Sequence, residues 1–144
     1  MKTVADILRE AGIHPSAQRL AIGEYVLHTA AHPSAEQVLA ETQKRLPRVS
    51  VATIYNTLHL FVEHGLLRTL EIAEGHTVYD PCMEPHHHFV DDDTGRIHDV
   101  PLDAVHITHQ PLEGFDVREV QVVLRGRSQT QPEPTSQPKR SSHA

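Results

Sequence analysis

The fold is decided by residues 50–79, which read SVATIYNTLHLFVEHGLLRTLEIAEGHTVY. In the first half, apolar residues recur every three or four positions after Ser50 and stop at Gly65, which predicts an amphipathic helix with a serine N-cap. Beyond it, apolar and polar residues alternate to Ile72 and resume at Thr77 after a Glu-Gly turn, which predicts a β-hairpin. A helix that runs directly into a hairpin indicates the end of a winged helix, a helix-turn-helix variant.

Three further helices are predicted before this stretch. Each follows a hydroxyl residue that can cap it, namely Thr3, Ser16 or Ser34. Gln37 stands three residues after Ser34, the spacing of a capping box. Helices followed by a hairpin predict an α+β fold with a winged-helix DNA-binding domain in residues 1–80.

The helix that starts after Ser50 keeps small, neutral, hydrogen-bonding side chains outside its apolar stripe. Such a face suits a helix lying in the major groove of DNA. The same pattern also suits an ordinary amphipathic helix with a polar solvent face, so the pattern alone leaves both interpretations open. The residues of this face are Ser50, Ala52, Thr53, Asn56 and Thr57.

Length, charge and cysteine content narrow the class of protein. The chain has 144 residues, which allows one ordinary domain or two very small ones, and a formal net charge of −6. Residues 1–70 carry seven Lys or Arg against six Asp or Glu, whereas residues 71–128 carry four against twelve. The single cysteine excludes an internal disulfide and a four-cysteine zinc site. No export signal and no apolar run of about 20 residues is present, so we expect a cytoplasmic protein that does not enter a membrane.

The second half predicts short strands, a helix over Leu102–His109 and a final strand over Val117–Leu124. These few elements can bury only a small core, and we expect the core to be completed by dimerisation. Residues 81–127 are therefore predicted to form a small α/β domain for dimerisation and metal sensing. Residues 128–144 are rich in Gln, Ser, Thr and Pro, which predicts a disordered tail.

Thirteen residues are histidine, and seven of them lie within residues 76–109. His86 and His88 sit two apart on a predicted strand, so both rings face one side and can hold one metal, while His87 faces the other side. Asp80 and Asp99 are the nearest candidate carboxylates. Nitrogen and oxygen ligands without thiolate favour one Fe(II), Mn(II) or Zn(II) ion per subunit.

This ligand set also admits an enzyme, because two histidines and one carboxylate form the facial triad of non-haem iron oxygenases. However, the chain contains no Gly-rich phosphate loop, no nucleophile elbow and no zinc-protease motif. It is also short for a fold with a large substrate pocket. We therefore expect a binding protein rather than a small metal enzyme.

Four motifs together resemble the ferric uptake regulator family of bacterial repressors. They are Pro15–Arg19 (PSAQR), His32–Glu36 (HPSAE), Ser50–Leu58 (SVATIYNTL) and His86–Phe89 (HHHF). The resemblance covers about residues 3–126. It implies a homodimer that binds promoter DNA, with a metal between an N-terminal winged helix and a C-terminal dimerisation domain. Two recognition helices in a dimer imply a palindromic operator.

The resemblance also assigns residues. It implies that the regulatory metal ligands are His32, Asp80, His86, His88 and Asp99. Tyr55 and Asn56 match positions that face DNA, and Arg19 matches one that touches the backbone. Together with the helix face described above, the expected DNA contacts are Arg19, Ser50, Thr53, Tyr55 and Asn56.

Two departures from the family pattern bear on the signal. Asp91 and Thr94 stand where a Cys-x-x-Cys pair is usual, in what we interpret as a solvated turn at residues 91–93, so no structural zinc held by four cysteines is expected. The last strand lacks its usual histidine. The loss of cysteines, the triplet His86–His88, the shortened region 100–114 and the stretch Val122–Arg125 are most similar to the iron response regulator branch. That branch senses iron status through haem, with the histidine triplet implicated.

Three signals are compatible with these residues. Haem is one, because His86, His87 and His88 offer imidazole axial ligands. Reversible occupancy by Fe(II) or Mn(II) is another. The third is peroxide, which would act through Fe(II)-catalysed oxidation of His32 or His86, as in the peroxide-sensing members that share an aspartate at the position of Asp80. We favour iron status and control of iron and haem homeostasis genes, with a peroxide-sensing repressor as the alternative.

Overall fold

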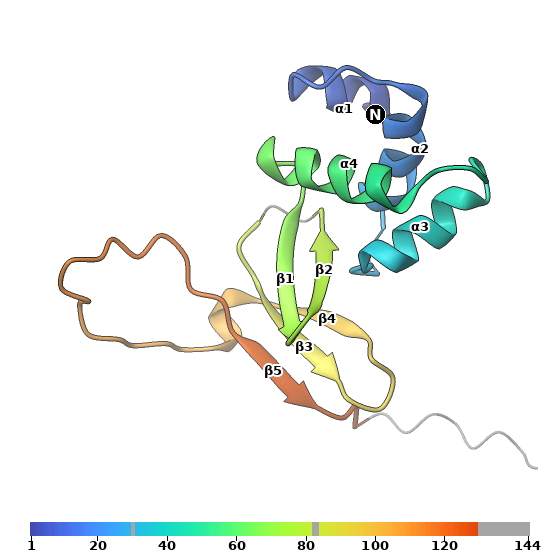
Figure 1. The fold of residues 1–144 in the computed structure, drawn as a ribbon. Coiled ribbons are helices and arrows are strands. Elements are labelled where there is room, and N and C mark those ends of the chain that lie inside the picture. Colours follow the sequence, from blue (N-terminus) through green and yellow to red (C-terminus); the bar gives the residue numbers. More distant parts are fainter. Residues whose placement is uncertain (30, 82–83, 130–144) are drawn as a thin grey trace, which may run out of the picture.

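The computed structural model describes residues 1–29, 31–81 and 84–129 of the chain (Figure 1). Four helices pack together beside a two-stranded antiparallel sheet, and a three-stranded sheet follows. This is the predicted α+β order with the winged helix first. The elements of this first part are α1 (Val4–Glu10), α2 (Ala17–Val26), α3 (Ala35–Gln43), α4 (Val51–Glu63), β1 (Arg68–Ala73) and β2 (His76–Asp80).

All four helices start at a hydroxyl side chain that accepts a hydrogen bond from a backbone N–H of the first turn, as predicted. Ser34 forms a full capping box, because its N–H donates to Gln37 Oε1 (2.8 Å) and its Oγ accepts from the Gln37 N–H (3.3 Å). Caps satisfy N–H groups that a helix start leaves unpaired, so they fix where α3 begins, just after His32. The four caps are Thr3, Ser16, Ser34 and Ser50.

The four helices enclose one apolar core, to which α4 contributes Ile54, Leu58 and Phe61. One expectation for α4 is wrong. Thr57, which the sequence placed on the outer face, is buried, and Val51 is exposed. Positions 54, 57, 58 and 61 follow the i, i+3, i+4, i+7 spacing of one helix face, and this geometry carries the threonine inward.

The second sheet has the strand order β4-β3-β5. Its strands are β3 (His87–Asp91), β4 (Ile97–Val100), which is antiparallel to β3, and β5 (Val123–Gly126), which is parallel to β3. In the turn between β3 and β4, Asp92 and Asp93 are exposed, as expected for a solvated turn, and only Asp91 departs from that interpretation. Asp91 is buried, and its Oδ1 accepts hydrogen bonds from the N–H groups of Asp93 (2.9 Å) and Thr94 (3.4 Å). Hydrogen bonds therefore close this turn.

Two predicted elements differ from the structure. The helix expected over Leu102–His109 is only a 3-10 turn, Leu102–Ala104, and the last strand lies two to six residues later than expected, at β5. On the side of β3 opposite β4, the strand partners are residues 123–126 alone. Residues 117–122, which were expected in the last strand, therefore lie outside the ladder. Residues 105–122 form an irregular arm that projects from the sheet (Figure 1), and exposed side chains such as Phe115 find no apolar surface within the described chain.

The predicted tail lies outside the described residues from residue 130 onward. Among the helices in the described ranges, none has the length and hydropathy that a membrane-spanning segment requires.

Candidate metal centre

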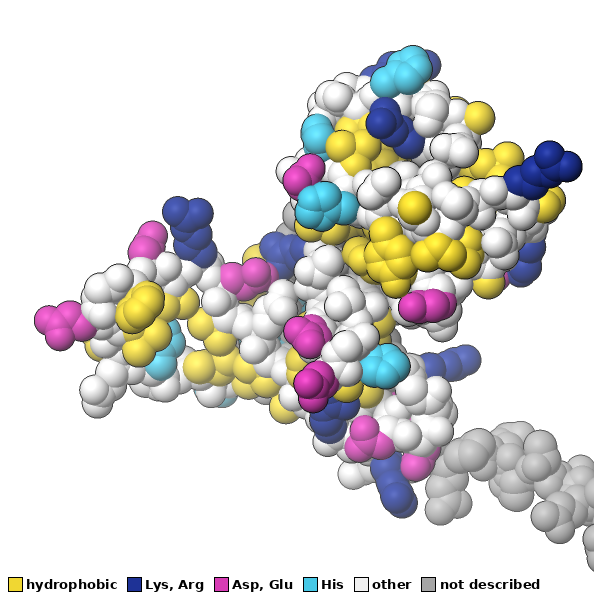
Figure 2. Space-filling model, in the orientation of Figure 1, with side chains coloured by type: hydrophobic (Ala, Val, Ile, Leu, Met, Phe, Trp, Pro, Cys, Tyr) yellow, Lys and Arg dark blue, Asp and Glu magenta, His cyan; other side chains and the backbone are white. Residues whose placement is uncertain are grey.

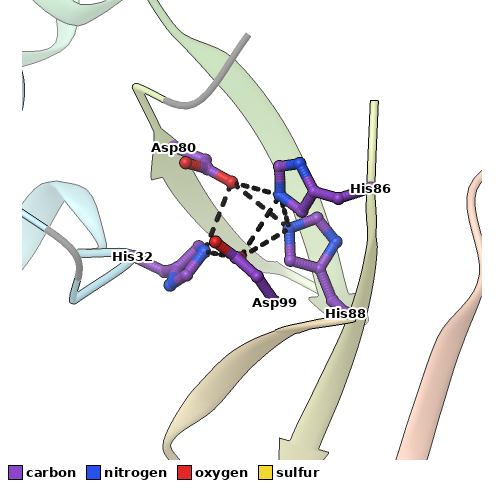
Figure 3. Close-up of side chains that lie close together, drawn as sticks. All are labelled: His32, Asp80, His86, His88 and Asp99. Atoms are coloured by element: carbon purple, nitrogen blue, oxygen red, sulfur yellow. Dashed lines mark hydrogen bonds and ion pairs between the residues drawn. The ribbon is translucent and has the colours of Figure 1, made fainter. Parts of the chain in front are cut away.

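Five side chains turn their ligand atoms toward one point (Figure 3), and these atoms all lie within 4.8 Å of one another. The α2–α3 connection supplies one histidine and the end of β2 supplies one aspartate. One histidine directly precedes β3, another lies at the second position of β3, and β4 supplies the second aspartate. The five residues are those that the sequence named: His32, Asp80, His86, His88 and Asp99.

Backbone pairing positions the first two of these side chains. Ser34 forms an isolated antiparallel bridge with Val78, and the N–H of Tyr79 donates to the carbonyl of Pro33 at 2.9 Å. The turn at His32 is thereby tied to the strand that ends at Asp80. His32 itself has φ 49°, a left-handed conformation that costs a non-glycine residue about 1–2 kcal/mol. Strain of this kind at a buried side chain is typical of functional sites.

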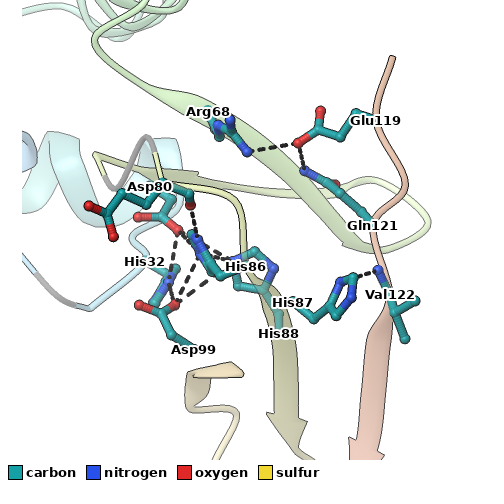
Figure 4. Close-up of polar contacts among 11 residues, drawn as sticks. His32, Arg68, Asp80, His86, His87, His88, Asp99, Glu119, Gln121 and Val122 are labelled. Atoms are coloured by element: carbon teal, nitrogen blue, oxygen red, sulfur yellow. Dashed lines mark hydrogen bonds and ion pairs between the residues drawn. The ribbon is translucent and has the colours of Figure 1, made fainter. Parts of the chain in front are cut away.

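Strand geometry positions the other three. His88 lies opposite Asp99 in the β3–β4 register, and His86 lies two residues before His88. The Nε2 atoms of His86 and His88 are 2.9 Å apart, so the predicted two-residue spacing does place both rings on one side. His87 points the other way (Figure 4) and is buried, with its Nδ1 accepting a hydrogen bond from the N–H of Val122 at 3.2 Å.

The distances fit a single ion. Asp80 Oδ2 lies 2.8 Å from His86 Nε2, and Asp99 Oδ1 lies 2.9 Å from His32 Nε2. Two ligands bound at about 2.1 Å and at right angles are separated by about 3.0 Å. Five donors exceed the four of a closed tetrahedral zinc site. The set instead suits an ion of higher coordination, such as Fe(II) or Mn(II), with one position left open.

The protonation of His86 supports a cation at this point. Its Nδ1 lies 2.6 Å from the carbonyl oxygen of Glu84, and a carbonyl only accepts, so Nδ1 carries the proton. In the neutral ring, Nε2 then presents a lone pair toward the oxygen of Asp80. A cation between these two atoms, either a metal ion or a proton, holds them together. This carbonyl contact is also the outer support that metal-bound imidazoles usually have.

The other two histidines differ from each other in their affinity for a proton. The hydrogen bond to Asp80 is the main reason why the pKa of His32 is raised, although burial acts against it, and Asp99 adds to the effect. Burial is the main reason why the pKa of His88 is lowered, although Asp80 acts against it. Within the described residues, the buried Nδ1 atoms of both rings have no hydrogen-bond partner.

The expected DNA face of α4 is partly free. Tyr55 and Asn56 are exposed, and the Tyr55 hydroxyl donates to Glu36 Oε1 at 3.4 Å. The hydroxyls of Ser50 and Thr53 lie 2.9 Å apart, and Ser50 Oγ also caps the helix, so both are engaged at the start of α4. The face therefore offers an aromatic ring and an amide to a groove.

The remaining expected contact, Arg19, is half-buried near the start of α2. Its Nη1 donates to the carbonyl of His14 at 2.9 Å. Sequence reasoning missed a further ion pair, Arg68 Nη1 to Glu119 Oε1 at 2.7 Å, which joins β1 to the arm (Figure 4). The two residues are 51 positions apart, and no local pattern connects them.

A winged helix linked to a small sheet through three histidines and two aspartates defines the class of metal-dependent DNA-binding regulators. The chain matches the ferric uptake regulator family over residues 10–125, and it belongs to that family. It is thus a transcriptional regulator and not an enzyme, and regulators of this family bind DNA and act as dimers.

Two bacterial peroxide regulators are similar to this chain over most of their length. The chain is 31% identical over 129 residues to the peroxide operon regulator of Bacillus subtilis (strain 168), covering 88% of this chain and 89% of that one. It is 31% identical over 122 residues to the peroxide-responsive repressor PerR of Staphylococcus epidermidis, covering 83% and 81%.

Solved structures have the same fold. The ferric uptake regulator from Pseudomonas aeruginosa with manganese superposes with a TM-score of 0.67 at 24% identity, covering 89% of this chain and 99% of that one. PerR from Streptococcus pyogenes superposes with a TM-score of 0.51 at 26% identity, covering 90% and 92%. At 24% identity, the likeness to the Pseudomonas structure concerns the fold alone.

Proposed function

We propose that this chain is a metal-responsive repressor in which one Fe(II) or Mn(II) ion per subunit joins the DNA-binding domain (1–80) to the dimerisation domain (81–127). The observation that carries the proposal is the origin of the ligands. Two come from the first domain and three from the second, so one ion bridges the domain boundary. The ligands are His32, Asp80, His86, His88 and Asp99.

The bound ion supplies positive charge and a fixed coordination geometry, and the chain's own residues convert this into DNA affinity. His32 sits on the segment that leads into α3, and α3 packs against α4. Holding His32 against β3 and β4 therefore orients α4 relative to the dimer. In a dimer, two α4 helices held at a fixed separation match a palindromic operator with half-sites about one helical turn apart.

On this operator, Tyr55 and Asn56 face the bases and Arg19 contacts the backbone. Ser50 and Thr53 lie at the start of the helix face that enters the major groove. The net charge of −6 opposes binding to phosphate. However, the acidic excess lies in residues 71–128, outside most of the winged helix, and two of its carboxylates, those of Asp80 and Asp99, are metal ligands in the proposed state.

The test is the double variant His86→Ala/His88→Ala, measured for binding to a promoter duplex with Mn(II) and with a chelator. We expect weak binding that no longer responds to metal, with circular dichroism and sedimentation unchanged. The matched control is His106→Ala/His109→Ala, which removes two exposed histidines of the arm. If the first variant binds DNA as tightly as wild type in both conditions, the proposal fails.

Iron status is the first candidate for the signal, and peroxide is the second. Peroxide is favoured by the similarity to the peroxide regulators of Bacillus and Staphylococcus. A ligand set without thiolate and with an open position is also compatible with peroxide reaching bound iron. Mass spectrometry after peroxide exposure separates the two signals. A gain of one oxygen atom on His32 or His86 with Fe(II), but not with Mn(II), supports peroxide sensing.

Haem is the weaker form of iron sensing, because His87 is not a free ligand. Its Nδ1 accepts from Val122, so in the neutral ring the proton is on Nε2, and that proton must be lost or moved before Nε2 can bind iron. We expect no Soret shift that depends on His87 in a haem titration. A shift present in wild type and absent in His87→Ala would restore the haem hypothesis.

A further inference from the structure

The winged-helix domain contains two arginines that the fold leaves unused. Residues 1–70 include seven Lys or Arg, all in the described part of the chain. Arg45 and Arg48 are exposed, and neither guanidinium has a hydrogen bond or an ion pair with a described residue. The other five contact a carboxylate or a backbone carbonyl: Lys2, Arg9, Arg19, Lys44 and Arg68.

Both arginines lie on the short connection between α3 and α4. This connection is an ordered turn, in which the N–H of Val49 donates to the carbonyl of Leu46 at 3.1 Å, and it ends at Ser50, the cap of α4. The free charges are therefore fixed within five residues of the start of the recognition helix. In Figure 2, Lys and Arg side chains lie at the edge of the molecule where Figure 1 places this connection.

Arg48 also faces the start of a second helix. A hollow of about 390 Å³ is lined by Arg48 together with Ala17 and Gln18, the first two residues of α2. Arg19 is the next residue of α2. The starts of α2 and α4 and the unpaired side chains of Arg45 and Arg48 therefore lie along one part of the surface. The start of a helix carries partial positive charge, which adds to that of the arginines.

The wing has the opposite character. The β1–β2 hairpin carries Glu71 and Glu74, and its basic side chains are His76 and Arg68, of which Arg68 is paired with Glu119. A basic hairpin can supply phosphate contacts, but here the carboxylates repel phosphate. Attraction for the DNA backbone is therefore concentrated at the other edge of α4.

We propose that Arg45 and Arg48 bind phosphates of the DNA backbone and anchor each recognition helix at the start of α4. This inference rests on the proposed DNA-binding function. Phosphate contacts set affinity and register and carry no direct sequence information. Each neutralised phosphate contributes about −0.9 to the slope of log K against log salt, so four arginines in a dimer account for a slope of about −3.6.

The experiment uses the full chain with Mn(II) and a duplex selected by the wild-type protein from random sequence. Fluorescence anisotropy at several salt concentrations gives the slope for Arg45→Ala/Arg48→Ala and for Arg45→Lys/Arg48→Lys. We expect the alanine variant to bind more weakly and lose about 3 to 4 units of slope. The lysine variant keeps the slope, and both variants keep the wild-type preference for the selected duplex over a scrambled one.

The matched control is Arg96→Ala/Arg127→Ala, which removes the same charge from the other domain and leaves the slope unchanged. A wild-type slope in the alanine variant overturns the assignment of Arg45 and Arg48, while the proposed function stands. A loss of sequence preference also overturns it, because the arginines then read bases. If wild type selects no duplex at all, the proposed function itself fails.

Discussion

We expect His32→Ala to reduce the number of protons that metal binding releases. His32 Nε2 lies 2.9 Å from Asp99 Oδ1 and 3.2 Å from Asp80 Oδ2. The hydrogen bond to Asp80 is the main reason why the pKa of His32 is raised. Below that raised pKa, the proton on Nε2 lies between the two carboxylates, where a divalent ion must bind. Metal therefore displaces this proton.

The pH dependence of metal affinity follows from competition between a proton and the metal ion for His32 Nε2. As the pH falls below the raised pKa of His32, metal affinity falls tenfold per pH unit, or about 1.4 kcal/mol. The pKa of His88 is lowered, mainly by burial, so His88 takes up its proton at lower pH than His32 does. In the metal-free fold, protonated His32 is stabilising below the unfolded pKa of about 6.5, and this stabilisation is lost as the pH rises through the raised pKa.

Titration calorimetry with Mn(II), in two buffers of different ionisation enthalpy, counts the protons released. At pH near 6.5, wild type should release between about half a proton and one proton more than His32→Ala, because a raised pKa leaves His32 more than half protonated there. His106→Ala, at an exposed histidine of the arm, is the control and should match wild type. Equal proton counts for His32→Ala and wild type would refute the placement of the proton on His32.

Gly23→Ala should lower the free energy of unfolding by about 1–3 kcal/mol in urea, because its Cβ would lie 2.7 Å from Val4 Cγ1. Asp91→Ala should cost about 1 kcal/mol in the same assay, because the N–H groups of Asp93 and Thr94 lose the buried Asp91 carboxylate as their acceptor. A double-mutant cycle on Arg68 and Glu119 should give a coupling of at most about 1 kcal/mol, because the pair is partly exposed. Dialysis against EDTA should leave a folded dimer by circular dichroism and sedimentation, and unfolding would contradict the absence of a structural zinc site.

The sequence by itself determined the features that depend on neighbouring residues. Helix caps such as Ser34 and the strand alternation that puts His86 and His88 on one side act over two to four positions. They are therefore visible as spacing in the chain, and the structure reproduces them. The arm of residues 105–122 is different, because the local pattern there predicted the end of a helix and most of a strand, and the structure forms neither.

Only the tertiary structure decided how the metal ligands meet. By its own spacing His32 looks like a loop residue before a proline, and only the family resemblance singled it out. The contact of His32 with Asp99 spans 67 positions, and it depends on the bridge between Ser34 and Val78 and on the register of β4 against β3. Pairing over such distances is set by packing of whole elements, which no short stretch of sequence encodes.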